Sequence, residues 1–336
     1  MKFERNAAPY VISFILPIVI FLGMLVGLSV YLEPVEGDLA RLGHWAERDF
    51  RSRVPQPIDS VNENGVSITH PTALVLGDSF SRPNIWQSHV AQTRNIEILS
   101  YYFKDVGCLH NWVRWVSEKP YPTVKTIIIE TVEREFVPRF GRDHACPSAN
   151  PKPFEMPAHT VESEQGQFAL IKDANYLWET LKNSITMEER GSKIVSGKVV
   201  NVSLNTGGLF SNRKSNRLLF YRTDESKQDW TKSDISMAIA RLEKIQSDLD
   251  KVGLRLVVVV IPDKSTIYAP YFSHEKDKVG YPDIFTPLAE SRVNTVNLMH
   301  YFQRQLVTTV DLYKPNDTHL SQSGYRLMAA KVADQM

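Results

Sequence analysis

Hydrophobic residues along the chain fall into short continuous runs separated by amphipathic stretches. Five runs rich in branched residues have the length of strands buried on both faces, at 72–76, 96–100, 124–129, 254–261 and 307–311. Continuous apolar runs of this length are typical of parallel sheets. We therefore predict an α/β fold whose doubly wound parallel sheet presents its ligand-binding residues at the carboxyl ends of the strands.

Helical periodicity fills the intervals between these runs. The clearest example extends from Ser233 to Val252, and its apolar residues share one face: Ile235, Ile239, Leu242, Ile245 and Leu249. Ser233 or Asp234 can cap its start, and Gly253 can end it. A second helix is expected over 321–335, in "SQSGYRLMAAKVADQ".

One interval, 135–230, is too long for a plain connection between two strands. It contains a helical pattern over 169–184, with a predicted apolar face made by Leu170, Ala174, Leu177, Trp178 and Leu181. Proline-rich and Gly/Asn-rich stretches surround this helix. We predict that 135–230 is an insertion or cap over the strand ends, where a substrate would be selected.

The longest apolar run, 10–32, carries no charge and would form a helix about 35 Å long. A cleaved signal peptide would have a shorter apolar core and a small-residue cleavage site, and neither is present. Basic residues precede the run and acidic ones follow it: Lys2 and Arg5, then Glu33, Glu36 and Asp38. We therefore predict a cytoplasmic tail over 1–9, a single-pass anchor over 10–32 and a periplasmic domain over 33–336.

Composition and charge exclude few classes of function. The formal net charge of +1 gives no general attraction to nucleic acid, so none is expected as a partner. The two cysteines, Cys108 and Cys146, can form one disulfide in an exported domain. No clustered His, Cys, Asp or Glu spacing indicates a metal, and no cofactor is expected.

The stretch "GDSFS" at 77–81 directly follows the first apolar run, so Ser79 lies on a predicted strand-to-helix turn. Taken alone, a serine here is more often a helix cap than a nucleophile. "NDTH", however, places Asp317 and His319 before the last predicted helix, at the same edge of a parallel sheet. Histidine can take the serine proton while a carboxylate fixes its tautomer. We predict Ser79 as nucleophile, His319 as base and Asp317 as its orienting acid, with Asp311 the alternative acid.

"GDSFS", the distant Asp–His pair and "HLSQSG" together resemble the SGNH hydrolase superfamily. Further stretches resemble its membrane-anchored O-acetyltransferases of bacterial exopolysaccharides, of the alginate acetylation kind. These are "EGDLARLGHWAERDF" at 36–50, "IIIETVERE" at 127–135, "SNRLLFYR" at 215–222 and "IPDKSTIYAP" at 261–270. Two features depart from the family. Its usual members space the acid and histidine as DxxH, whereas "DTH" at 317–319 is one residue shorter. Its alginate-type members place a DxH before the serine, whereas here it follows Ser79.

The resemblance implies an SGNH or flavodoxin-like sheet and the same triad. It also implies an oxyanion hole made by the backbone N–H groups of Ser79 and Gly107. An ordinary turn is the alternative for Gly107. The family's asparagine block would fall near 130, where "ETVER" offers no amide, so a third donor is unassigned. Glu130 and Arg134 are expected to form a structural pair, with substrate contact as the alternative for Arg134.

Two other residues are candidates for binding sugar. Tyr101 could stack on a sugar ring, although core packing is the commoner fate of an aromatic side chain. Arg213, in "SNRKSNR", could attract an anionic sugar, although such charge runs are more often solvated loops.

The resemblance implies a periplasmic enzyme that transfers acetyl groups to polysaccharide hydroxyls through a serine acyl-enzyme. It further implies an acetyl donor supplied by a membrane-bound acyltransferase partner, within an exopolysaccharide synthesis and export complex at the inner membrane. Two alternatives remain open: an esterase that uses the same triad, and a non-catalytic polysaccharide-binding component. Sequence does not separate transfer from hydrolysis, because the outcome depends on how water is excluded.

Overall fold

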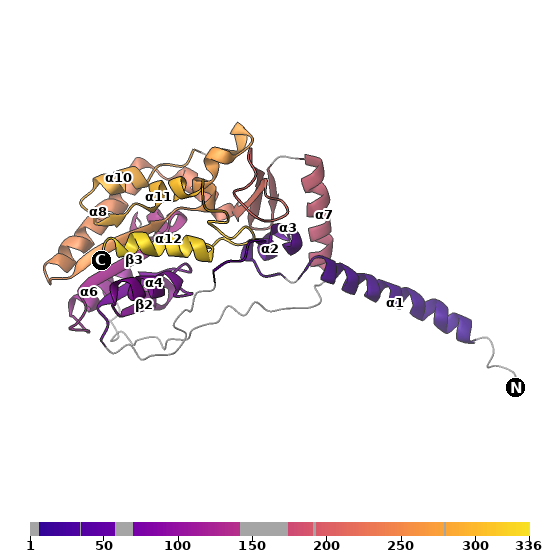
Figure 1. Cartoon of the computed structure of the whole chain (residues 1–336), viewed down its shortest axis with the longest axis horizontal. Helices are drawn as coiled ribbons and strands as arrows, with labels where there is room; N and C mark the ends of the chain where they lie inside the picture. Colours follow the sequence, from indigo (N-terminus) through magenta and orange to yellow (C-terminus); the bar gives the residue numbers. More distant parts are fainter. Residues whose placement is uncertain (1–6, 34, 58–69, 142–173, 191–192, 279) are drawn as a thin grey trace.

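A parallel sheet forms the centre of the domain (Figure 1). The structure is a computed structural model that describes residues 7–33, 35–57, 70–141, 174–190, 193–278 and 280–336. The sheet has the order β2-β1-β3-β7-β8, and all its strand pairs are parallel. Its strands are β1 (Ala73–Gly77), β2 (Ile98–Tyr102), β3 (Thr126–Val132), β7 (Arg255–Ile261) and β8 (Thr295–Val296). The predicted α/β fold and its first four strands are confirmed.

The order of the strands reverses between β1 and β3, since the chain passes from β1 to β2 on one side and then to β3 on the other. In open α/β sheets, ligands bind outside the carboxyl ends of the strands at such a switch point. Ser79 follows β1 and Arg134 follows β3. The turn that contains Ser79 therefore lies at the switch point, where a ligand is expected to bind.

The predicted strand at 307–311 is wrong. These residues form turns after helix α11 (Leu298–Gln305), and the last strand of the sheet is the short β8. Val307 and Val310 are 79% and 41% exposed, so this branched run has no buried face. Asp311 adopts a left-handed backbone with φ of 55°, which interrupts an extended conformation.

Helices cover both faces of the sheet. One face packs against α4 (Ile85–Arg94), α11 and α12 (Gln322–Ala333). The other packs against α6 (Leu109–Ser117), α8 (Lys232–Asp250) and α10 (Phe285–Glu290). The five apolar residues predicted for α8 are all buried. Its cap is Thr231, whose hydroxyl accepts from Asp234 N in a capping box, rather than Ser233 or Asp234.

The interval between β3 and β7 holds a second sheet that the sequence did not reveal. Helix α7 (Ala174–Arg190) precedes three antiparallel strands in the order β4-β5-β6: Ile194–Ser196, Val199–Ser203 and Arg217–Tyr221. One face of this sheet contributes to the same core as β1 and β7, through Val200, Val202, Leu218 and Phe220. The other face packs on short helices α2 (Asp38–Gly43) and α3 (Glu47–Phe50). The sheet is thus continuous with the domain, and its role as a cap stays a prediction.

Helix α7 departs from its predicted face. Leu177 is buried, but Trp178 and Leu181 are 63% and 42% exposed. Leu170 lies outside the described residues. The remaining short helices are α5 (Phe103–Val106) and α9 (Lys264–Ile267). Val137–Gly141 forms a short π-helix, and 3₁₀ turns lie at Glu133–Glu135, Arg222–Asp229, Ala269–Tyr271 and Glu275–Asp277.

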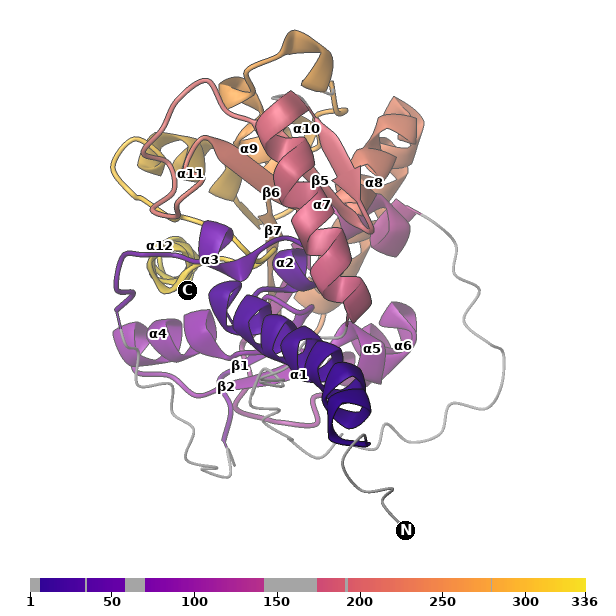
Figure 2. The ribbon, with the colours of Figure 1, turned by 90° about the vertical axis from the view of Figure 1, so that its right-hand side faces the viewer.

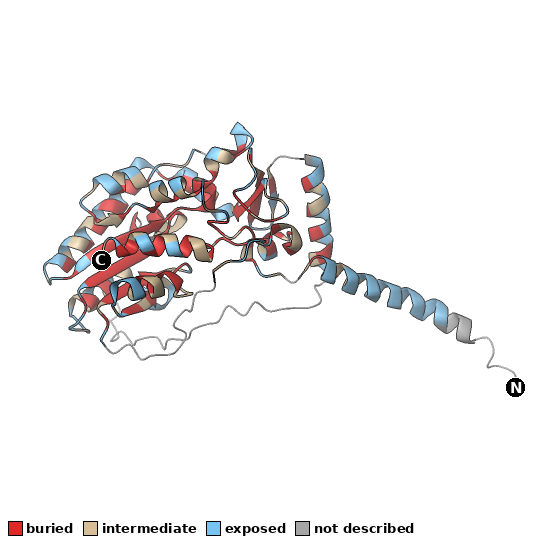
Figure 3. Cartoon of the chain, viewed as in Figure 1, coloured by how far each residue is buried: buried red, intermediate tan, exposed pale blue. Residues whose placement is uncertain are grey.

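Helix α1 (Ala7–Tyr31) projects from the domain and is exposed along most of its length (Figures 1 and 3). Its segment Ile12–Tyr31 has a mean hydropathy of 2.5 and is the one helix of the described chain long and apolar enough to cross a membrane. Leu25, Leu28 and Leu32 pack against Ala46 and Leu177, which fixes the base of α1 to the domain. The helix is a candidate anchor, and its orientation stays a prediction.

Candidate active site

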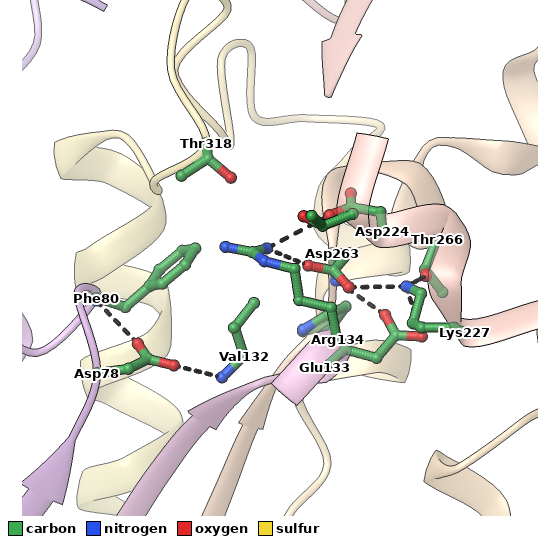
Figure 4. Close-up of polar contacts among 12 residues, drawn as sticks. Asp78, Phe80, Val132, Glu133, Arg134, Asp224, Lys227, Asp263, Thr266 and Thr318 are labelled. Atoms are coloured by element: carbon green, nitrogen blue, oxygen red, sulfur yellow. Dashed lines mark hydrogen bonds and ion pairs between the residues drawn. The ribbon is translucent and has the colours of Figure 1, made fainter. Parts of the chain in front are cut away.

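The turn after β1 is fastened to the end of β3. Asp78 Oδ2 accepts from Val132 N at 2.8 Å and from Arg139 Nη1 at 3.0 Å. Asp78 Oδ1 accepts from Phe80 N at 3.0 Å, and Figure 4 shows this carboxylate between Phe80 and Val132. Arg139 also donates to Thr131 Oγ1 at 2.6 Å. These contacts hold the backbone on both sides of Ser79.

Glu130 supports the same turn from inside the sheet. Its Oε2 accepts from Asp78 N at 3.0 Å and from Ser81 Oγ at 2.6 Å. Burial raises the pKa of Glu130 well above its ordinary value, and the Asp78 carboxylate raises it further. A Cβ on Gly77 would lie 2.2 Å from Ser81 Oγ, so this close approach requires glycine.

A pocket of about 270 Å³ opens beside Ser79. Its lining includes Ser79, Arg82, Tyr102, Arg134 and Arg139. Ser79 is exposed, and its backbone N–H donates to no described residue. The pocket therefore offers a free hydroxyl and a free N–H group among cationic side chains.

The Asp317–His319 pair lies in the loop before α12. Asp317 Oδ1 and His319 Nδ1 are 2.6 Å apart, and both side chains are largely buried. Burial alone would lower the pKa of His319, but the Asp317 carboxylate outweighs burial and raises it. Burial would raise the pKa of Asp317, but His319 lowers it well below its usual range. His319 Nε2 has no hydrogen-bond partner among the described residues. A paired histidine with a vacant nitrogen is the arrangement that a general base requires.

The structure brings Ser79 and His319 to the same edge of the sheet without joining them. The Phe80 and His319 rings lie 4.9 Å apart between centroids. In the described chain, no hydrogen bond links Ser79 Oγ to His319. Phe80 packs beside the imidazole, and the catalytic roles of the triad stay predictions. Asp311, the alternative acid, accepts instead from Ser52 Oγ at 2.7 Å and Ser211 N at 2.8 Å.

Helix α2 forms a cradle for this loop that we did not predict. Asp38 Oδ1 accepts from Thr318 N at 2.9 Å, while Asp38 N donates to Asp317 Oδ2 at 3.3 Å. Burial raises the pKa of Asp38 to about 6, and the Asp317 carboxylate adds to the effect. Gly37 approaches the loop so closely that a Cβ would lie 2.1 Å from Asn316 O. The loop that carries the Asp–His pair is thus completed by residues that follow α1.

Two further buried groups position the loop. Lys264 Nζ donates to the carbonyl oxygens of Lys314, Pro315 and Asp317 at 2.9, 3.3 and 2.9 Å. Burial lowers the pKa of Lys264 to about 8. Glu47 accepts from the amide of Asn316, and burial raises the pKa of Glu47 to about 7. The only sequence signal for Asp38, Glu47 and Lys264 was their place within the stretches "EGDLARLGHWAERDF" and "IPDKSTIYAP".

Arg134 joins a buried charge cluster rather than Glu130, which corrects the expected pair. Its Nη1 lies 2.5 Å from Asp263 Oδ1 and 3.5 Å from Asp224 Oδ1 (Figure 4). Lys227 Nζ lies 2.8 Å from Asp263 Oδ2 and 3.0 Å from a Glu133 oxygen. The cluster ties Arg134 to the end of β7 while leaving it on the pocket wall.

Three other predicted site residues, Tyr101, Gly107 and Arg213, do not line this pocket. Tyr101 is buried, with its ring 5.6 Å from Trp115 in the core, and the neighbouring Tyr102 lines the pocket instead. Gly107 is exposed at φ of 67° after α5 and is not part of the pocket wall. Arg213 is exposed in the loop between β5 and β6. Cys146 lies outside the described residues, so its disulfide with Cys108 stays a prediction.

Asp38, Asp317 and His319 also form a cluster of possible metal ligands, with one donor atom of each within 4.8 Å of the others. Their atoms are engaged with one another and with the backbone: Asp317 Oδ1 with His319, Asp317 Oδ2 with Asp38 N, and Asp38 Oδ1 with Thr318 N. Hydrogen bonds therefore account for the cluster, and the expectation of no metal stays a prediction.

Comparison with known families adds one finding. Residues 215–336 match the family model described as the SGNH hydrolase-like domain of acetyltransferase AlgX. No curated protein matches the chain. The family match includes Asp317 and His319 but not Ser79. It confirms the resemblance to the SGNH superfamily and to the alginate acetylation kind.

Proposed function

We propose that this chain, whose residues 215–336 match the SGNH hydrolase-like domain of acetyltransferase AlgX, transfers acetyl groups to hydroxyls of a bacterial exopolysaccharide. The main support is the buried Asp317–His319 pair, whose free Nε2 lies at the same edge of the sheet as the exposed Ser79. The pocket beside Ser79 offers space for an acyl group.

In the proposed reaction, Ser79 Oγ attacks the acetyl carbonyl of the donor while His319 Nε2 takes the hydroxyl proton. Asp317 holds Nδ1–H and stabilises the imidazolium that results. The Ser79 backbone N–H, which has no described partner, stabilises the oxyanion. When the tetrahedral intermediate collapses, the leaving group takes the proton from His319 and acetyl-Ser79 remains. A polysaccharide hydroxyl then repeats the cycle as the attacking group, which releases the acetyl ester and restores Ser79.

This mechanism requires Ser79 Oγ to come within hydrogen-bond distance of His319 Nε2, which has no hydrogen-bond partner among the described residues. Catalytic hydrogen bonds commonly tighten only when substrate binds.

The proposed setting is the periplasmic face of the inner membrane, with α1 as a single-pass anchor. An anchored enzyme stays beside a polymer synthesis and export complex. Acetyl-CoA is a cytoplasmic donor, so a membrane-bound acyltransferase partner would supply the acetyl group. The acceptor is the polysaccharide itself.

Two observations favour alternative functions. Ser79 is exposed, so water can reach an acyl-enzyme, which would make the chain an esterase. Ser79 and His319 share no hydrogen bond, as expected for a component that binds polysaccharide without catalysis.

The test is to incubate the detergent-solubilised full chain with an activated acetyl ester and oligosaccharides. Acetylated sugar supports transfer, free acetate alone supports hydrolysis, and no turnover supports binding only. Ser79→Ala should abolish an acetyl mass adduct on the protein, whereas Ser226→Ala, far along the chain in an exposed turn, should retain it. If the adduct survives Ser79→Ala, Ser79 is not the nucleophile.

A further inference from the structure

Helix α7 has an apolar stripe on its outer face. Trp178, Leu181 and Ile185 are 63%, 42% and 52% exposed. Their spacing of three and four residues places them along one side of the helix. The inner face is fully used, since Leu177 and Met187 are buried and Asn183 Nδ2 donates to Gly43 O at 3.0 Å. The outer stripe therefore remains largely exposed in the described structure.

The position of α7 relates this stripe to the candidate anchor. In Figure 1, α7 crosses the end of the domain from which α1 projects. Figure 2, viewed from that end, shows α7 and α1 in front of the sheet. Leu25 and Leu28 of α1 pack with Leu177, and Arg48 lies 3.7 Å from the Tyr31 ring. The two helices are thus joined by packing at the point where α1 leaves the domain.

The length of the apolar segment sets the depth of this junction. Ile12–Tyr31 has 20 residues, about 30 Å as a helix, which is the thickness of a bilayer hydrocarbon core. Leu25 and Leu28 lie in the last two turns of that segment, so Leu177 must lie near the membrane boundary. Trp178 is its neighbour. Tryptophan is enriched at this boundary, where its ring contacts both acyl chains and headgroups.

We infer that α7 lies on the surface of the bilayer that α1 enters, with Trp178, Leu181 and Ile185 inserted into its interfacial layer. The inference rests on the proposed anchor. Two contacts with the membrane, one by α1 and one by α7, fix the rotation of the domain about α1, which a single helix does not. The pocket beside Ser79 then has a set orientation relative to the bilayer.

The test uses tryptophan fluorescence of the full chain reconstituted into vesicles of phosphatidylethanolamine and phosphatidylglycerol, with and without brominated lipid. Trp178 is the exposed one of six tryptophans: Trp45, Trp86, Trp112 and Trp230 are buried and Trp115 is half-buried. Brominated lipid should quench part of the emission, and Trp178→Phe should lose that quenching. Trp115→Phe, in the core on the far side of the sheet, should retain it.

The other outcomes overturn the inference. Quenching of Trp178 by aqueous acrylamide but not by brominated lipid means that α7 faces water. Protection from both quenchers means that protein, such as a second copy of the chain, covers the stripe. A chain that fails to float with the vesicles after an alkaline wash removes the anchor itself. A chain that floats with Trp178 unquenched leaves the anchor intact and refutes only the role of α7.

Discussion

Replacing Gly37 by alanine is the sharpest test of the cradle that holds the Asp–His loop. Gly37 has φ of −84° and ψ of 142°, so alanine is allowed by the backbone and any effect must be steric. The new Cβ would lie 2.1 Å from Asn316 O, whereas non-bonded heavy atoms normally stay about 3.5 Å apart. Either α2 or the loop must move by more than about 1 Å.

The magnitude follows from the contacts that this movement would break. Ala40 N to Asn316 O at 3.1 Å and Thr318 N to Asp38 Oδ1 at 2.9 Å both cross the same gap. Overpacking of this kind costs about 1 to 3 kcal/mol, and each kcal/mol lowers Tm by about 2 to 4 °C in a domain of this size. A displacement of about 1 Å in a catalytic group can cost about 100-fold in rate. We therefore expect a large fall in the rate of adduct formation, about 100-fold, with only a modest fall in Tm.

The assay combines the rate of acetyl-adduct formation on the full chain, thermal unfolding, and hydrogen exchange over 312–321. Gly37→Ala should slow the adduct, lower Tm modestly and raise exchange in that segment. Gly207→Ala is the matched control, since its Cβ would lie 3.6 Å from the nearest atom outside its chain neighbours. A Gly37→Ala variant with unchanged exchange and an unchanged adduct rate would refute the proposed role of the cradle.

Two other predictions concern buried charges. Asp317→Asn should slow adduct formation by on the order of 10³- to 10⁴-fold. The pH at which the rate is half-maximal should also fall, because the carboxylate that raises the pKa of His319 is gone. A pH–rate profile with an unchanged midpoint would contradict this. Lys264→Met should change the pH dependence of stability, since the folded pKa of about 8 lies below the ordinary 10.5. Between pH 8 and 10.5 the unfolded state holds more protons than the folded state, so the unfolding free energy of the wild type should rise by up to ~3 kcal/mol over that range. Denaturant titrations should show no such rise for the variant.

Local pattern was sufficient for much of the fold. The runs that became β1, β3 and β7 are buried on both faces, so their composition reports their environment directly. Helix α8 could also be predicted from the sequence, because its apolar residues all face one core. The prediction of a strand at 307–311 was wrong because Val307 and Val310 are exposed, so a branched run does not by itself ensure a buried strand.

Only part of the candidate site could be predicted from the sequence, for a different reason. Ser79, Asp317 and His319 stand in short motifs that can be recognised locally. Asp38 and Lys264 contact the loop from distant parts of the chain, through hydrogen bonds that produce no periodic pattern in the sequence. Trp178 and Leu181 fitted a helical face, but whether that face meets the core, water or another apolar phase depends on the neighbours of α7.

The contact between α2 and the Asp–His loop has a consequence for biosynthesis. Asp38 and Asp317 are 279 residues apart, so a ribosome that adds about 5 to 20 residues per second makes the second roughly 15 to 55 s after the first. During that time Asp38 and Glu47 lack their hydrogen-bond donors in the loop, Thr318 and Asn316. The histidine can acquire its final environment only when the chain has closed this long loop. A nascent chain would therefore carry Ser79 well before the loop with Asp317 and His319 is complete.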